Sequence, residues 1–216
     1  EVAEAARRRG VRVLVDGAQA VGQLPVNVRE LGCDFYAVAG QKWLLGPMGT
    51  GALYVRKEVQ GELRPPFVGW ASIAQRDLPA LRFELHPSAR RYEVATAHLP
   101  SCAGLAAAVD LLLGIGLEAV QARIRDLAGA AKAQLGALRD VRVLTPLEPE
   151  ASAGLVSFTV EGTDPARLVR ALYEKHRIIA RWVPHPRCVR VSLHAFNTLD
   201  EVDALVRAVA AERSAG

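Results

Sequence analysis

The sequence predicts an α/β protein in which a mixed, mostly parallel sheet domain precedes a smaller α+β domain. Two apolar runs, residues 11–15 and 35–39, each lead directly into glycine and polar residues, which is typical of buried parallel strands. Apolar residues then recur at three- and four-residue steps through 117–138, which predicts an amphipathic helix. Beyond it, short β-like runs alternate with two further helical segments. This order favours one large and one small domain.

The large domain is expected over residues 1–115, where each element follows from a local pattern. A helix over residues 1–9 precedes the two parallel strands. The next apolar run, residues 52–55, follows the second strand so closely that it should pair with that strand in antiparallel fashion. Residues 62–100 contain five prolines and indicate a long irregular segment. Residues 101–114, rich in Ala and Leu, predict a buried helix, because the segment is apolar nearly all round.

The small domain is expected over residues 141–216, joined to the large one by a linking helix at 116–140. A helix begins at Asp164-Pro165, with Asp as the N-cap and Pro at the first helical position. The last helix opens with a capping box at residues 198–201. The expected strands of this domain are 141–144, 155–160, 178–181 and 187–193.

Composition excludes several classes of function. The net charge of +4 is dispersed, without a continuous basic stripe or interleaved aromatics, so nucleic-acid binding is not expected. Three cysteines without paired spacing favour a reducing, cytoplasmic location and predict neither a disulfide framework nor a metal site. No apolar run is long enough to span a bilayer, so no membrane partner is expected.

The two predicted parallel strands carry the chemistry at their ends. The first ends in Asp16, with Gln19 three residues later, and the second leads into Gln41 and Lys42. Because ligands of open α/β sheets bind beyond the carboxyl ends of strands, these side chains should converge. An amine can form a Schiff base with an aldehyde, and a carboxylate can keep a pyridinium nitrogen protonated. The set predicts a pyridoxal phosphate site. Taken singly, Asp16 could instead cap a turn and Lys42 could be a surface lysine.

The segments VDGAQ, AGQK and GPMGTGALYV together resemble the class V aminotransferase family, which includes cysteine desulfurases and kynureninase. The resemblance implies the fold type I architecture of pyridoxal-phosphate enzymes and an amino acid as the small-molecule substrate. It implies that Lys42 carries the cofactor as an imine and moves protons at the substrate α-carbon. Asp16 would hold the ring nitrogen protonated, and Gln19 would bind the ring hydroxyl.

The remaining cofactor contacts are also implied by the resemblance. Gln41 replaces a His that often precedes the lysine, and its amide can still donate to the phosphate. Ala39 stands where desulfurases commonly have a phosphate-binding Ser. The segment RYEVATAH resembles the family's R-x-E-x-G-T motif, with Ala95 in place of its Gly. In that motif the Thr reaches the cofactor phosphate of a partner subunit, so the family predicts a homodimer with Thr96 in this role.

Arg190, in VRVSLHAFNT, resembles the family's arginine that binds the substrate carboxylate, and a guanidinium fork matches a carboxylate bidentately. Its alternative is a surface position on an edge strand. Arg181 is a second substrate-binding candidate. Cys188 lies only two residues before Arg190, whereas a desulfurase needs its cysteine on a mobile loop. On a strand the two share a face, but Cys188 would lack reach.

Neither the family's glycine-rich phosphate turn nor its ring-stacking residue is found in the sequence, which suggests the C-terminal portion of a longer enzyme that alone would bind the cofactor weakly. Transamination, C–S or C–C lysis and epimerisation all stay open. Two other functions are weighed against a class V aminotransferase or lyase: a cysteine desulfurase, and a catalytically silent fragment or interaction module. A nicotinamide-binding oxidoreductase is a distant third, since the glycines at 46–51 do not form the dinucleotide fingerprint.

Overall fold

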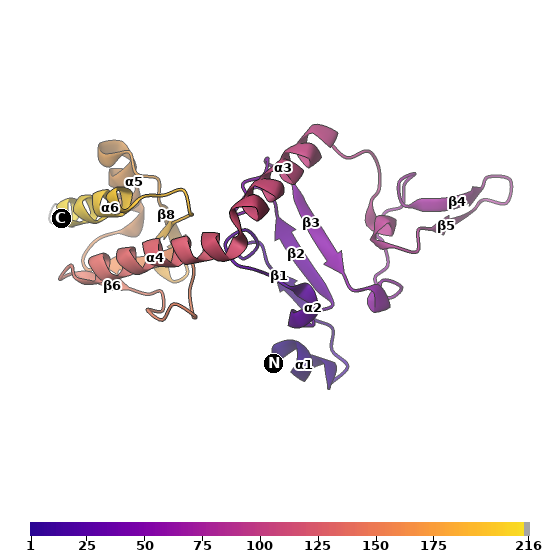
Figure 1. Ribbon diagram of the computed structural model, residues 1–216, viewed down its shortest axis with the longest axis horizontal. Coiled ribbons are helices and arrows are strands. Elements are labelled where there is room, and N and C mark those ends of the chain that lie inside the picture. The colour runs from indigo at the N-terminus through magenta and orange to yellow at the C-terminus, as the bar shows by residue number, and fades with distance from the viewer. Residues whose placement is uncertain (214–216) are drawn as a thin grey trace. The chain divides into compact units, whose positions relative to one another are not determined.

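The computed structural model describes residues 1–213 and divides them into two compact units, residues 1–114 and the part that begins at Ile115. Figure 1 shows the elements of each unit. The first unit contains the helices and 3-10 turns α1 Val2–Arg7, α2 Val28–Leu31, η1 Lys57–Val59, η2 Ala89–Tyr92 and most of α3 Leu99–Ile115. Its strands are β1 Leu14–Asp16, β2 Phe35–Ala39, β3 Gly51–Val55, β4 Ile73–Asp77 and β5 Arg82–Leu85.

A three-stranded sheet in the order β1-β2-β3 organises the first unit. β1 is parallel to β2, with Asp16 opposite Ala37, and β3 is antiparallel to β2, with Gly51 opposite Ala39. The expected antiparallel third strand is therefore confirmed. Parallel pairing places the ends of β1 and β2 at the same edge of the sheet, and the polar residues come after both strands there.

Two expectations for the first unit are wrong. Residues 62–100 are not wholly irregular, since β4 and β5 pair as an antiparallel hairpin around Leu78–Leu81. Pro79 lies in the turn of this hairpin and the other four prolines lie outside both strands, so none of them removes an N–H from the strand pairing. Helix α3 is also not buried all round: Leu112 is its only buried residue. Gly104 and Leu105 of α3 lie close to the turn that follows β2, whereas Leu111 and Leu113 are exposed.

The second unit is a four-stranded antiparallel sheet in the order β6-β7-β9-β8, with α4, α5 and α6 packed on one face. Its elements are α4 Leu117–Gly136, β6 Val141–Val143, β7 Leu155–Val160, α5 Pro165–His176, β8 Arg181–Pro184, β9 Arg187–Ser192 and α6 Leu199–Glu212. Figure 1 shows α4 alongside α6, which it contacts. The helix expected to link the domains thus supplies part of a core, through Leu127, Ala128, Ala131 and Leu135.

Local signals explain how this unit begins and ends its helices. The Asp164 side chain accepts from Arg167 N at the start of α5, and Thr198 and Glu201 form the predicted capping box of α6. The strand expected at 178–181 is wrong, because Arg177 ends α5 in a left-handed conformation and Ile178 N bonds back to Leu172 O. Residues 178–180 complete that cap, so the strand starts only at Arg181.

One buried ammonium group ties a loop to the second unit's core. Lys132 of α4 is only 5% exposed, and its Nζ donates to Pro146 O, Leu147 O and Ser152 Oγ at 2.9–3.0 Å. All three donor positions are satisfied by loop acceptors, which lowers the cost of burying the charge. Lys132 therefore holds the loop between β6 and β7 in place.

Among residues 1–213 no single helix is long and apolar enough to cross a membrane; α3 and α4 reach the required length and composition only together, as a broken pair. Within the same residues no group of three or more His, Cys, Asp or Glu side chains could hold a metal ion.

Candidate active site at the ends of two parallel strands

Asp16 is the last residue of β1, and its carboxylate is exposed at the sheet edge. One oxygen, Oδ1, accepts from Ala18 N at 3.0 Å, which fixes the side chain over the turn after the strand. Within the described chain, Oδ2 has no hydrogen-bond partner. The turn thus orients the carboxylate and leaves one oxygen available to a ligand.

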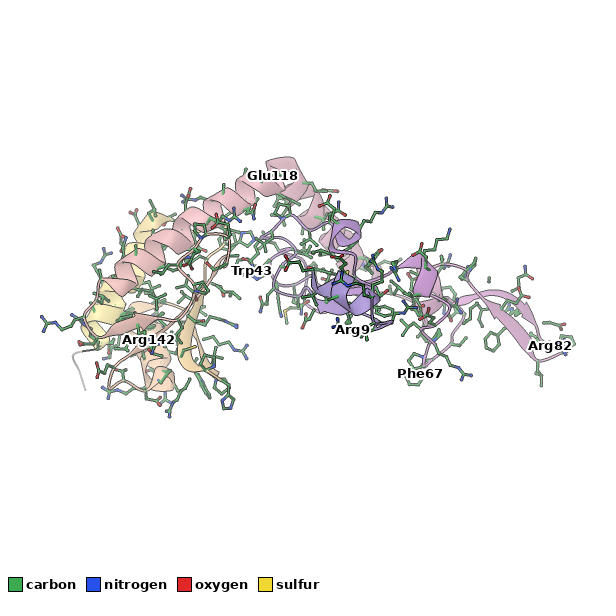
Figure 2. The ribbon with its side chains drawn as sticks, turned by 90° about the horizontal axis from the view of Figure 1, so that it is seen from below. Arg9, Trp43, Phe67, Arg82, Glu118 and Arg142 are labelled. Carbon is green, nitrogen blue, oxygen red and sulfur yellow. The ribbon has the colours of Figure 1, made fainter. Side chains whose placement is uncertain are left out.

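Gln19 connects the two strand ends. Its Oε1 accepts from the indole Nε1 of Trp43 at 2.8 Å, and Trp43 directly follows Lys42. Trp43 is 5% exposed and is labelled in Figure 2. Because an indole N–H can only donate, the amide oxygen of Gln19 must face Trp43, and its NH₂ group keeps a donor for a ligand.

Glycines let the two turns approach each other closely. At Gly22, where φ is +102°, an added Cβ would lie 2.3 Å from the backbone C and O of Trp43. Residues 20–23 therefore rest directly on the segment that carries Lys42. At Gly17, an added Cβ would lie 1.9 Å from Cε1 of Tyr36, so the Tyr36 ring packs against the backbone just behind Asp16. Burial raises the pKa of the Tyr36 hydroxyl, and the nearby Cys33 and Asp16 raise it further.

The Gly22 contact leads to a stability prediction. Gly22→Ala should lower the free energy of unfolding by about 2 kcal/mol or more, because it adds a backbone clash to an unfavourable positive φ. Gly49→Ala is the matched control. Gly49, in the connection between β2 and β3, also has a positive φ, +79°, but has open space around the position of an added Cβ. Urea unfolding of both variants separates the two effects. Equal losses for both would show that the packing of residues 20–23 on Trp43 contributes nothing.

Lys42 lies in a loop whose two ends are joined by backbone hydrogen bonds. Gly40 N donates to Thr50 O and Gly46 N donates to Gly40 O, both at 2.8 Å, and Leu45 N donates to the carbonyl of Lys42 at 3.1 Å. The Lys42 and Gln41 side chains are exposed, and within residues 1–213 neither has a hydrogen-bond or ion-pair partner. A defined backbone thus presents a free amine next to the Gln19–Trp43 contact.

Thr96 lies in the exposed stretch between η2 and α3. The adjoining backbone is held closely: at Gly69, an added Cβ would lie 2.0 Å from Val94 O. Tyr92 anchors the segment by donating from its hydroxyl to Gln60 O at 2.7 Å. The structure therefore presents Thr96 at the surface of the first unit, and its contact with a partner subunit stays a prediction.

The expected substrate-binding arginines belong to the second unit. Arg190 is central in β9, which pairs with β7 on one side and β8 on the other, so it does not lie on an edge strand. Its Nε is buried and has no hydrogen-bond partner in the described part of the chain. Arg181 lies directly opposite on β8 and is exposed. Cys188 is 1% exposed within β9.

Trp43 and Tyr36 complete the first-unit site, although no motif singles them out. Each contacts the other strand end through a residue about 20 positions away in sequence, so local periodicity carries no sign of it. The signal for Trp43 is its indole N–H, which must find an acceptor once the ring is buried next to Lys42.

Comparisons with known proteins identify the family of the chain. The family description "Aminotransferase class-V" matches residues 1–205. Isopenicillin N epimerase of Amycolatopsis lactamdurans is 36% identical over 95% of the chain and 54% of its own length, and a probable cysteine desulfurase of Halalkalibacterium halodurans is 32% identical over 96% and 52%. The chain thus spans about half the length of the curated relatives it matches.

Solved structures show the same fold. The apo cysteine desulfurase of Thermococcus onnurineus NA1 superposes with a TM-score of 0.90 at 29% identity, over all of this chain and 56% of that one. The cystine C–S lyase C-DES, in complex with its product cysteine persulfide, gives 0.84 at 37% identity, over 93% and 52%. The expected fold class is confirmed. On the match across residues 1–205, the chain belongs to the class V aminotransferase family, fold type I enzymes that use pyridoxal phosphate.

Proposed function

We propose that the protein is a pyridoxal-phosphate-dependent enzyme that acts on an amino acid, with Lys42 as its catalytic residue. The observation that carries the proposal is the Gln19–Trp43 hydrogen bond of 2.8 Å, which links the turn after Asp16 to the turn that holds Lys42. A carboxylate, an amide donor and an amine thereby come from the ends of two adjacent parallel strands.

The residues present fit this cofactor by the chemistry of their donors and acceptors. Asp16 offers a free carboxylate oxygen for a pyridinium N–H, and Gln19 offers an amide N–H for a ring hydroxyl. Lys42 offers an amine for the aldehyde. For the phosphate, Gln41 can donate from its own subunit, and we propose that Thr96 does so across a homodimer.

Bound pyridoxal phosphate supplies an electron sink for the bonds of the substrate α-carbon. The chain's own residues bind and move protons around it. Asp16 keeps the ring nitrogen charged, Lys42 Nζ takes and returns the α-proton, and Arg190 binds the substrate carboxylate through its unpaired guanidinium. Transamination, lysis and epimerisation diverge only after a bond at the α-carbon has been broken, so all three stay within the proposal.

Borohydride reduction tests the attachment point. The reduced, cofactor-loaded protein should yield one peptide with a pyridoxyl group on Lys42, because reduction makes the lysine–cofactor bond permanent. Lys57, an exposed lysine of the same unit, is the internal control and should stay unlabelled. A label on Lys57 in place of Lys42 would refute the assignment, and no label at all would favour a catalytically silent protein.

Cysteine desulfurase is the alternative reaction, because several relatives carry that name. A desulfurase needs a thiol that can move to the substrate sulfur. Cys188 is instead buried within β9, opposite Val183 of β8, and the two strands are joined directly through His185 and Pro186. A thiol in a paired strand cannot travel, which supports a reaction without a persulfide on Cys188.

Cys188→Ser should therefore leave kcat on the substrate within about twofold of wild type, since the thiol takes no part in the chemistry. Turnover and unfolding should be measured together, so that a loss of packing is not mistaken for a loss of chemistry. Cys102→Ser, at an exposed position on α3, is the control. If wild type released sulfide from cysteine and a folded Cys188→Ser protein did not, the desulfurase alternative would be correct.

A further inference from the structure

The face of the second unit's sheet that points away from its helices is cationic. The strand residues packed in the core include Val156, Phe158, Val189 and Val191, so the alternate residues of β7 and β9 point to the opposite face. That face carries the arginines Arg142, Arg181 and Arg190, and β6, β7, β8 and β9 contain no acidic residue.

Three residues of this face form one row across the strands. Ser157 of β7 lies opposite Arg190 of β9, which lies opposite Arg181 of β8. Residues directly opposite each other on antiparallel strands have Cβ atoms about 5 Å apart and share a face. The row thus sets two guanidinium groups and a hydroxyl side by side.

No acidic side chain in the described part of the chain forms an ion pair with this row. The ion pairs of residues 1–213 include neither Arg181 nor Arg190, and the buried Nε of Arg190 has no hydrogen-bond partner. Arg187, at the end of the same hairpin, is by contrast paired with Asp164 of α5. Like charges placed directly opposite are destabilising, so the fold gains nothing from the Arg181–Arg190 pair unless an anion binds there.

One substrate carboxylate on Arg190 would neutralise only half of this pair. A second guanidinium one strand away, with five donors of its own, would remain without a partner. An amino acid with a second carboxylate balances both charges, because each guanidinium group then binds one carboxylate. Ser157 can donate to the carboxylate on Arg190, because its hydroxyl has no partner among the described residues.

We propose that the substrate is an α-amino acid that carries a second carboxylate, and that Arg181 binds this second group while Arg190 binds the first. The proposal rests on the proposed function for the identity of the substrate as an amino acid. Binding of two carboxylates by Arg181 and Arg190 depends only on the second unit's sheet. The neutral amide analogue of such a substrate should bind poorly, because it leaves Arg181 unpaired.

Amine-free diacids test the site separately from the cofactor chemistry, since they cannot react with an aldehyde. Succinate, glutarate and adipate, each against its monoamide, should be titrated by calorimetry into the cofactor-loaded protein. At least one diacid should bind roughly 10-fold or more tightly than its monoamide. If Lys42 failed to take the pyridoxyl label while the diacid still bound, the proposed function would be refuted, whereas the assignment of Arg181 and Arg190 as a site for two carboxylates would be kept.

Variants then assign the two carboxylates. Arg181→Gln should weaken the diacid roughly 10-fold or more and leave its monoamide unchanged, whereas Arg190→Gln should weaken both. Arg170→Gln removes the same charge from an exposed position on α5, the helix on the other face, and should change neither. The proposal is overturned if no diacid outbinds its monoamide. It is also overturned if Arg181→Gln weakens both ligands equally, because both arginines would then share one carboxylate.

Discussion

Lys42→Ala should reduce turnover of the amino-acid substrate by about 1,000-fold or more, since it removes both the amine that attaches the cofactor and the group that moves the α-proton. The substituted side chain is exposed and has no partner among residues 1–213, so the fold should be unaffected. The backbone contact from Leu45 N to the carbonyl of residue 42 is kept in the variant.

Three measurements make this result specific. Single-turnover kinetics should show the loss in the chemical step, and thermal unfolding should match wild type. Borohydride should leave the variant unlabelled, whereas Lys57→Ala should keep both label and activity. A Lys42→Ala protein that keeps activity within tenfold of wild type would show that another group performs the proton transfer.

The sequence predicted the parts of the site that local pattern controls. Apolar runs that end in Asp16 and in Gly40-Gln41-Lys42 identify two parallel strands, and the short path from β2 to β3 identifies an antiparallel pair. These inferences succeed because strand ends and chain reversals depend on residues that are adjacent in sequence. The same is true of the Asp164 and Thr198 caps.

The features that the sequence missed depend on contacts between distant residues. The Gln19–Trp43 hydrogen bond and the Tyr36–Gly17 contact each join segments separated by a whole strand connection. The β4–β5 hairpin was not predicted, because the five prolines of residues 62–100 indicated an irregular segment. All five prolines lie outside both strands. The burial of α3 was overestimated because an apolar composition shows what a helix can bury, not which neighbours it has.

Asp16→Asn should lower kcat by roughly 10- to 100-fold, because it removes a charge-assisted hydrogen bond to the protonated ring nitrogen. Asn is nearly isosteric and keeps an oxygen that can accept from Ala18 N, as Asp16 Oδ1 does at 3.0 Å. The turn after β1 should therefore keep its shape. Only the charge changes: an amide cannot stabilise a neighbouring pyridinium, so the ring becomes a weaker electron sink.

Asp77→Asn is the matched control for this change, because Asp77 Oδ1 accepts from Ala80 N at 3.1 Å in a similar turn at the end of β4. It should leave kcat and cofactor affinity unchanged. Steady-state kinetics and cofactor titration of both variants separate an effect of the ring nitrogen's partner from an effect of turn geometry. An Asp16→Asn enzyme with the kcat of wild type would mean that the carboxylate acts only as a turn residue, and the assignment of the ring-nitrogen site to the end of β1 would be wrong.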